Sequence, residues 1–242
     1  MPEPAAPPEL ISTIVPWMET PDGPMVLIDT AGLRRRARIA DRLERLAVVS
    51  AVRAVERCHV AVLLVDGAAD AGADQDRHLL GLAADRGRAL IVAVNKLDLV
   101  LGAAAQRELD QKLRDAFGFA AYAPILFVSA RSGRGIRELL KTIARTDEAY
   151  NRRVGTGELN RFLEDAVTKH SPPLFHSRPV RLLYAAQTGV RPPTFIFVSN
   201  RPEGVHPSYQ RYLENRLRER YGFDGCPIRL RFRKARRNEE GR

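Results

Sequence analysis

Four short apolar runs in the first part of the chain constrain its fold more than any other feature. They cover residues 25–28 (MVLI), 59–65 (HVAVLLV), 89–94 (ALIVAV) and 125–128 (ILFV). None of them alternates apolar with polar residues, and this is typical of parallel strands that are buried on both faces. Segments with helical periodicity lie between them. The sequence therefore predicts an α/β domain in which strands and helices alternate.

A polar residue follows each apolar run. These residues are Asp29, Asp66, Asn95 and Ser129. Ligands of open α/β sheets bind outside the carboxyl ends of the strands. We therefore expect the functional site at the edge of the sheet where these side chains lie.

A different pattern begins near Asn151. The predicted elements are a helix (159–167), two strands (180–186 and 194–199), a second helix (207–221) and a last strand (228–232). Their order, αββαβ, predicts a small α+β domain after the α/β domain.

The net charge is distributed unevenly along the chain. Residues 1–150 contain 20 basic and 20 acidic side chains, whereas residues 151–242 contain 19 basic and 9 acidic ones, so the whole net charge of +10 lies in the second part. Such asymmetry favours a polyanionic partner for that part. Arginine outnumbers lysine 34 to 5. This ratio suits phosphate binding, or it reflects the codon usage of a GC-rich genome.

Several protein classes are unlikely on composition alone. The first residues lack the basic and apolar regions of a secretory signal, and no apolar run approaches the ~20 residues that span a bilayer. The two cysteines, Cys58 and Cys226, suit a reducing compartment. No Cys/His cluster has the spacing of a metal site. We therefore expect a cytoplasmic protein with no membrane association.

The most specific motif is Asn95-Lys96-Leu97-Asp98, directly after an apolar run. In an N-K-x-D loop the aspartate carboxylate can accept from both N1–H and the 2-amino group of guanine, whereas adenine offers neither donor in that arrangement. Unmatched buried acceptors are costly, so the loop would discriminate between the two bases. The lysine stem would cover one face of the base, and Asn95 would tie neighbouring loops together. The alternative is an ordinary helix-capping loop.

Two weaker motifs follow other runs. Asp29-Thr30-Ala31-Gly32 matches the D-x-x-G loop of P-loop GTPases, which lies near Mg²⁺ and the γ-phosphate. In the segment that begins Ser129-Ala130-Arg131, the Ala130 amide could reach guanine O6. Each alone is an ordinary turn. The three motifs in this order resemble a P-loop GTPase.

A phosphate-binding loop, G-x-x-x-x-G-K-[ST], does not occur in the sequence, because none of its five lysines follows a glycine. Backbone N–H groups and the lysine of that loop cradle the phosphates. The base pocket alone should therefore bind nucleotide weakly.

Longer segments resemble one GTPase family. Residues 29–36 (DTAGLRRR) and 44–54 (ERLAVVSAVRA) look like the second GTPase domain of the bacterial Der/EngA proteins. Residues 184–187 (YAAQ), 192–195 (PPTF) and 209–218 (YQRYLENRLR) look like their KH-like domain. The resemblance implies an α/β fold: a truncated, Ras-like P-loop GTPase sheet followed by a small α+β KH-like domain.

The resemblance also implies the domain boundaries. We expect a disordered lead-in (1–11), a partial GTPase domain (12–152), a KH-like domain (153–235) and a charged tail (236–242).

The family's function follows from the same resemblance. It implies a GTPase that uses GTP or GDP with Mg²⁺ and K⁺ and acts in assembly of the large ribosomal subunit, with rRNA as partner and no DNA. The expected nucleotide-binding residues are Asp29, Gly32, Asn95, Lys96, Asp98, Ser129, Ala130 and Arg131. No catalytic residue and no metal ligand is assigned. The alternative is a non-catalytic module that binds rRNA or a pre-ribosomal particle on a vestigial GTPase scaffold.

The KH-like part contains one G-x-x-G sequence, residues 222–225 (GFDG). It follows a predicted helix and precedes the last strand, so we expect a helix C-cap with Gly222 in the left-handed region rather than an RNA clamp. RNA contact would instead come from arginines. The candidates are Arg211, Arg218, Arg229, Arg231 and Arg233. Their alternatives are a solvated surface or a salt-bridged interface with the GTPase part.

Overall fold

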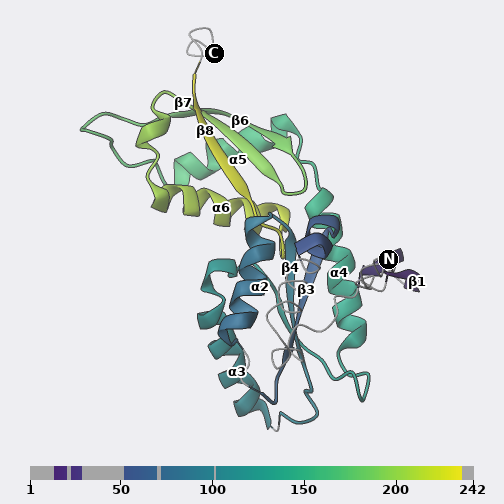
Figure 1. Cartoon of the computed structure of the whole chain (residues 1–242). Coiled ribbons are helices and arrows are strands. Elements are labelled where there is room, and N and C mark those ends of the chain that lie inside the picture. Colours follow the sequence, from purple (N-terminus) through teal and green to yellow (C-terminus); the bar gives the residue numbers. More distant parts are fainter. Residues whose placement is uncertain (1–13, 21–22, 29–51, 70–71, 101, 236–242) are drawn as a thin grey trace, which may run out of the picture. The chain divides into compact units, whose positions relative to one another are not determined.

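A computed structural model describes residues 14–20, 23–28, 52–69, 72–100 and 102–235 (Figure 1). The chain forms two compact units, Met1–Cys58 and His59–Arg242. The described strands form three sheets, one in the first unit and two in the second.

The first unit contains an antiparallel hairpin. Strands β1 (Ile14–Thr20) and β2 (Gly23–Ile28) pair from Ile14 opposite Ile28 to Thr20 opposite Gly23. Residues 52–57 are helical. The predicted run at 25–28 thus lies in β2, but its expected burial in a parallel sheet is wrong, because Val26 is 54% exposed. The reason is its antiparallel pairing with β1, the one neighbour it has among the described strands.

The second unit begins with a parallel sheet in the order β3-β4-β5. Its strands are β3 (Val60–Asp66), β4 (Ala89–Asn95) and β5 (Ile125–Phe127). The register runs from Val60 opposite Ala89 to Asp66 opposite Asn95. The central strand β4 is buried from Ala89 to Val94, as its continuous apolar run predicted.

Helices connect these parallel strands, as parallel pairing requires. Helix α2 (Asp74–Asp85) joins β3 to β4, and α3 (Gly102–Ala116) with the short 3₁₀ helix η2 (Gly118–Ala120) joins β4 to β5. Helix α4 (Ile136–Asn151) follows β5. This alternation confirms the predicted α/β class.

The C-terminal elements follow the predicted αββαβ order. They are α5 (Thr156–Lys169), β6 (Leu182–Gly189), β7 (Thr194–Ser199), the 3₁₀ helix η3 (Pro202–Gly204), α6 (Pro207–Tyr221) and β8 (Arg229–Lys234). In the sheet β6-β7-β8, the first pair is antiparallel and the second is parallel. Helix α6 makes the crossover between the parallel strands β7 and β8.

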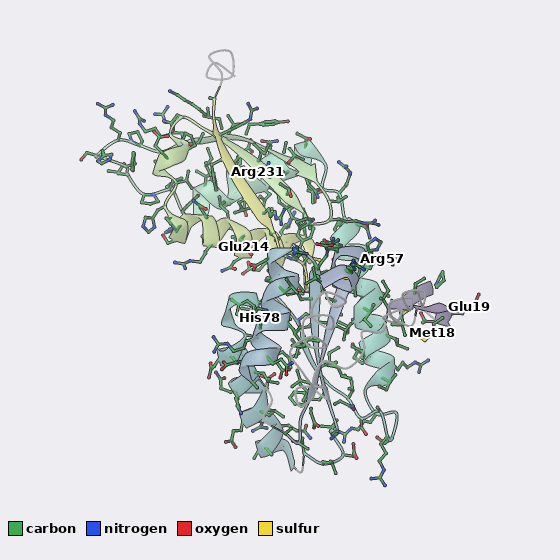
Figure 2. All side chains as sticks on the ribbon, viewed as in Figure 1. Met18, Glu19, Arg57, His78, Glu214 and Arg231 are labelled. Atoms are coloured by element: carbon green, nitrogen blue, oxygen red, sulfur yellow. The ribbon has the colours of Figure 1, made fainter. Side chains whose placement is uncertain are left out.

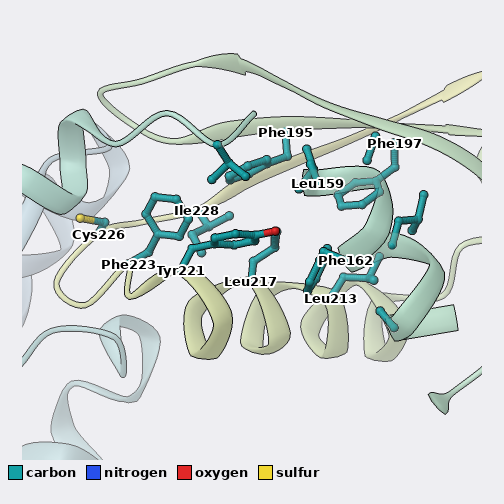
Figure 3. Close-up of a cluster of buried hydrophobic side chains, with 14 of the residues drawn as sticks. Leu159, Phe162, Phe195, Phe197, Leu213, Leu217, Tyr221, Phe223, Cys226 and Ile228 are labelled. Atoms are coloured by element: carbon teal, nitrogen blue, oxygen red, sulfur yellow. The ribbon is translucent and has the colours of Figure 1, made fainter. Parts of the chain in front are cut away.

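Helices α5 and α6 bury one face of this sheet (Figure 3). Phe162 from α5 and Leu213 and Leu217 from α6 belong to one buried cluster with Phe195 and Phe197 of β7. Each large side chain of this kind contributes about 1.5–3 kcal/mol when it leaves water. The aromatic and aliphatic cluster is therefore the main source of stability for the C-terminal elements.

The loop after α6 joins the C-terminal elements to the parallel sheet within the same unit. The Gly225 N–H donates to the Tyr122 carbonyl at 2.9 Å, and the Leu90 N–H donates to the Gly225 carbonyl at 2.7 Å. The Tyr150 hydroxyl donates to the Gly87 carbonyl at 2.7 Å, and Arg152 donates to the Tyr221 carbonyl. Hydrogen bonds to backbone carbonyls thus join the C-terminal elements to the α/β part of the unit.

The G-x-x-G sequence performs this joining. Gly222 ends α6 with φ +62°, and its N–H donates to the Arg218 carbonyl at 2.8 Å, which confirms the predicted C-cap. Gly225 has φ +74°, and a Cβ there would lie 2.7 Å from Thr146 Cγ2 and 3.1 Å from the Leu90 carbonyl. Glycine is therefore required at position 225 both by its backbone conformation and by the space around it.

We predict that Gly225→Ala lowers the free energy of unfolding by about 2–4 kcal/mol, because left-handed strain and overpacking each cost ~1–3 kcal/mol. The measurement is urea denaturation followed by circular dichroism.

The control is Gly157→Ala in α5, where a Cβ meets nothing within 4 Å. It should be neutral or slightly stabilising because alanine favours a helix. Equal stability of the two variants would show that the 225 position tolerates a side chain.

Candidate functional site

The N-K-x-D loop (95–98) and the loop 129–135, which we call the serine loop, lie together at the carboxyl end of the parallel sheet. Asn95 ends β4, and its Oδ1 accepts from the Ala130 N–H at 2.9 Å. Two residues later, the Leu97 N–H donates to the Val128 carbonyl at 3.0 Å. Asn95 therefore ties the two loops together as predicted. The Ala130 amide, predicted to reach guanine O6, is used here in the contact with Asn95.

A hydrogen bond orients the carboxylate that would read the base. Ser129 is buried at 1% exposure, and its Oγ donates to Asp98 Oδ1 at 2.6 Å. The Ser132 N–H in turn donates to Ser129 Oγ at 3.2 Å. These contacts determine which way the exposed carboxylate of Asp98 faces.

The same contact favours the ionised form of Asp98. The pKa of Asp98 is lowered below its ordinary value, first by the Ser129 hydroxyl, then by a backbone hydrogen bond, and less strongly by the charges of Arg131 and Lys96. A carboxylate that accepts two N–H donors has to be ionised. The electrostatics of the site therefore suit guanine at neutral pH.

Lys96 is fixed by a residue of the neighbouring strand. Its Nζ lies 2.7 Å from Asp66 Oδ2, and Asp66 Oδ1 accepts from the Ala68 N–H at 3.0 Å. The lysine backbone has φ +66°, an uncommon value for a side chain of this size. The sequence predicted the position of Asp66 at the strand end but not this partner. The sequence signal was that Asp66 and Asn95 each follow an apolar run, and the structure pairs these two residues in register.

Glycine shapes the turn between the serine loop and α4. Gly135 has φ +78°, and a Cβ there would meet the Phe127 carbonyl at 2.5 Å. The Ser129 N–H donates to the Arg134 carbonyl at 2.9 Å, which closes the turn. Helix α4 starts directly after it, so the position of the serine loop is coupled to the start of this helix.

The structure does not describe all of the residues expected at the site, and the described ones bear on metal binding. Asp29 and Gly32 lie outside the described residues. Within the described part of the chain, no group of three or more His, Cys, Asp or Glu side chains could hold a metal ion. The carboxylates nearest the base loops, Asp66 and Asp98, are engaged by Lys96 and Ser129. The described residues thus contain no cluster of carboxylate or imidazole ligands for a metal ion.

Comparison with known proteins agrees with this geometry. The family model of the KH-domain-like C-terminal domain of EngA bacterial GTPase enzymes matches residues 153–233. The elongation factor Tu GTP-binding domain matches residues 48–148. GTPase Der of Syntrophotalea carbinolica is 46% identical over 209 residues, and that of Moorella thermoacetica is 47% identical over 214 residues.

The chain belongs to the GTPase Der (EngA) family. These alignments cover 86% and 87% of the chain but 47% and 48% of the two relatives, so the chain spans about half the length of the curated relatives it matches. A crystal structure of Era in complex with MgGDPNP and a segment of 16S ribosomal RNA aligns with a TM-score of 0.47 at 15% identity, covering 93% of this chain and 82% of that one. None of the described helices is long and apolar enough to cross a membrane.

Two polar side chains of the C-terminal part, Asn160 and Gln187, have clear structural roles. The Asn160 side chain pairs with the backbone of Ala185, donating to its carbonyl at 3.0 Å and accepting from its N–H at 2.9 Å. Gln187 accepts from the Val154 N–H at 2.7 Å and donates to the Arg152 carbonyl at 2.9 Å. Both side chains hold segments of the KH-like region together.

The five candidate RNA-binding arginines are not equivalent. Arg218 is 16% exposed and donates to the carbonyls of Phe223 and Cys226, and its guanidinium lies 5.2 Å from the centroid of the Tyr122 ring. This is the interface role that the sequence left open for it. The other four, Arg211, Arg229, Arg231 and Arg233, are exposed.

We predict that Ser129→Ala raises the pKa of Asp98 toward its ordinary value of 3.8, because the hydroxyl is the largest cause of its lowering. The measurement is a carboxyl-carbon NMR titration. A lowered pKa stabilises the folded state above the ordinary value, and this stability is lost as the pH falls through the lowered one. The variant should therefore lose less stability on acidification.

The matched control is Ser132→Ala. Its hydroxyl accepts from the Arg134 N–H at 3.4 Å rather than contacting Asp98. An unchanged Asp98 pKa in Ser129→Ala would mean that the hydroxyl does not control the carboxylate.

Proposed function

We propose that this chain recognises guanine nucleotide and acts, as part of a Der-type GTPase, in assembly of the large ribosomal subunit. The observation that carries the proposal is the joining of the two base-recognition loops, through Asn95 to Ala130 and through Ser129 to Asp98. Loops of an ordinary capping turn would not need both contacts. The family membership supports the same role.

Base recognition follows from the ionised carboxylate. Asp98 accepts from guanine N1–H and from the 2-amino group, and adenine would present a lone pair and no 2-amino donor to the same oxygens. The unmatched carboxylate would lose its hydration without new donors, at a cost of about 1–3 kcal/mol. Lys96, held by Asp66, covers one face of the base. Arg131, beside Asp98, adds positive charge at the same edge.

Nucleotide affinity depends on more than the base. Phosphate and metal contacts supply most of it in P-loop GTPases, and the sequence has no G-x-x-x-x-G-K-[ST] run. GTP hydrolysis with Mg²⁺ and K⁺ is therefore proposed for the Der-type protein as a whole. The described residues supply base recognition alone, and Asp29 and Gly32 are proposed as further contacts near the phosphates.

The second candidate function is a non-catalytic module that binds rRNA or a pre-ribosomal particle. The observation in its favour is the excess of 19 basic over 9 acidic residues in 151–242.

We propose that the chain divides into a partial GTPase domain at 12–152 and a KH-like domain at 153–235, and that it is located in the cytoplasm.

We predict that the chain binds GDP and GTP weakly and ATP not detectably. A dissociation constant near 1 mM corresponds to about 4 kcal/mol, which is reasonable for a base pocket without a phosphate cradle. The measurement is an NMR titration that follows the amides of Asn95, Ser129 and Ala130.

Asp98→Asn makes this test more specific. The carboxylate of Asp98 accepts from the 2-amino group of guanine, whereas the asparagine side-chain amide would donate to the 2-carbonyl of xanthine. The variant should no longer bind GDP and should bind xanthosine diphosphate instead. The control is Asp85→Asn at the exposed end of α2, which should bind nucleotides like the parent chain. Equal response to GDP and ADP in the parent chain would overturn guanine recognition.

A further inference from the structure

The sheet β6-β7-β8 has an outer face that faces away from α5 and α6. Strand pairing defines its rows: Tyr184–Val198–Arg233 is one, Ala186–Ile196–Arg231 is the next, and Thr194 pairs with Arg229 in the third. Residues paired across neighbouring strands lie on the same face of a sheet. We call these eight residues the outer face.

The residues between these rows identify the opposite face. Ala185–Phe197–Phe232 and Gln187–Phe195–Leu230 are the intervening rows. All but Gln187 belong to the buried cluster or pack against it, and the rings of Phe197 and Phe232 stack at 5.5 Å. Helices therefore cover this side, and alternation directs the outer face away from them.

The outer face carries one sign of charge. Its basic residues Arg229, Arg231 and Arg233 alternate along β8 and are exposed, and strands β6, β7 and β8 contain no Asp or Glu. The Arg229 guanidinium lies beside Gly87, since a Cβ on that glycine would meet its Nη2 at 2.7 Å. Arg231 is therefore the residue to test for binding (Figure 2). The charge of the row fits a polyanion.

An exposed aromatic ring completes the face. Tyr184 is 42% exposed although it is central in β6, and Val198 beside it is fully buried. Beyond them, Ile196 is partly exposed. The outer face thus exposes the Tyr184 ring on β6 and part of Ile196 on β7, with a cationic side on β8.

We propose that the outer face binds single-stranded RNA. The phosphates lie along β8, where alternate side chains are about 6.6 Å apart, and the bases reach over β7 to stack on Tyr184, about 10 Å away. Stacking on an aromatic ring beside a basic row is how proteins bind unpaired strands. The inference rests on the proposed RNA role and assigns it to one face of the sheet.

A groove on the helix side is the competing location. It has a volume of about 310 Å³ and is lined by Pro207, Gln210, Arg211, Glu214, Ile228 and Leu230. Glu214 would repel phosphate, and no aromatic residue lines the groove. An extended acidic peptide is the competing ligand, but it offers no bases to stack on Tyr184.

The test uses the full chain and a fluorescein-labelled single strand of about ten nucleotides, a length within the range that one small domain covers. Fluorescence anisotropy gives the dissociation constant at several salt concentrations. Arg231→Gln should weaken binding several-fold and reduce the slope of log K against log salt by about 0.7, the value for one phosphate contact on a single strand.

Tyr184→Ala should weaken binding about tenfold with an unchanged salt slope, because a stacking contact releases no counterion. Tyr184→Phe keeps the ring and should bind like the parent. This pair separates loss of stacking from loss of folding.

The matched control for charge is Arg161→Gln on the exposed surface of α5, which should bind within about twofold of the parent, whereas Arg211→Gln tests the competing groove. A larger loss in Arg211→Gln than in Arg231→Gln would move the site to the groove and overturn the proposal. Equal affinity for a duplex, or for an acidic peptide of the same charge, would overturn it as well.

The guanine titration on the same samples separates this inference from the proposed function. Normal GDP recognition with no binding of the single strand would reject the outer face and leave nucleotide recognition intact. Binding of the strand without GDP recognition would support the outer face and favour the non-catalytic module.

Discussion

Strand β4 is the element on which the rest of the second unit depends. It is buried along nearly its whole length and pairs with β3 on one side and β5 on the other. Its first residues reach the C-terminal elements through the Leu90 hydrogen bond to Gly225. Its last residue, Asn95, holds the serine loop. One strand therefore connects the base-recognition loops to the KH-like region.

Helix α4 also connects the serine loop to the C-terminal elements. It begins at the glycine turn of the serine loop, and near its end Tyr150 donates to the Gly87 carbonyl within the shared core. The strand and the helix are both buried where they meet the C-terminal elements. The G-x-x-G loop that a nucleic-acid-binding KH domain uses as a clamp serves here as part of this joint.

Two binding surfaces follow from this arrangement, and they use different chemistry. The proposed guanine loops would read a base through the carboxylate of Asp98, which Ser129 orients. The outer face of the second sheet offers charge and a stacking surface instead. Because each surface can be altered without touching the other, nucleotide recognition and RNA binding can be examined separately in one chain.

Much of the fold and part of the site were predictable from local sequence. The apolar runs indicated β3, β4 and β5, and the αββαβ order of the C-terminal elements was as predicted. Asn95 and Asp98 were predicted as site residues because the N-K-x-D spacing is rare and follows a strand, and the structure brings their loop to the loop of Ser129. Three features were not predictable: the exposure of Val26, the Lys96 to Asp66 pair and the engagement of Arg218. The last two depend on neighbours that are distant in sequence, Asp66 for Lys96 and Tyr122 for Arg218.

The sequence by itself determined the class of each element, the family and the residue types at the base-recognition loops, because these follow from periodicity and from short motifs. The tertiary structure decided which groups meet. It put Gly225 against Leu90, turned Arg218 into a contact between the two sheets, and left the arginines of β8 with Tyr184 on one open face. The physical reason is that strand register and helix packing, which set these distances, are fixed only when the whole core is buried.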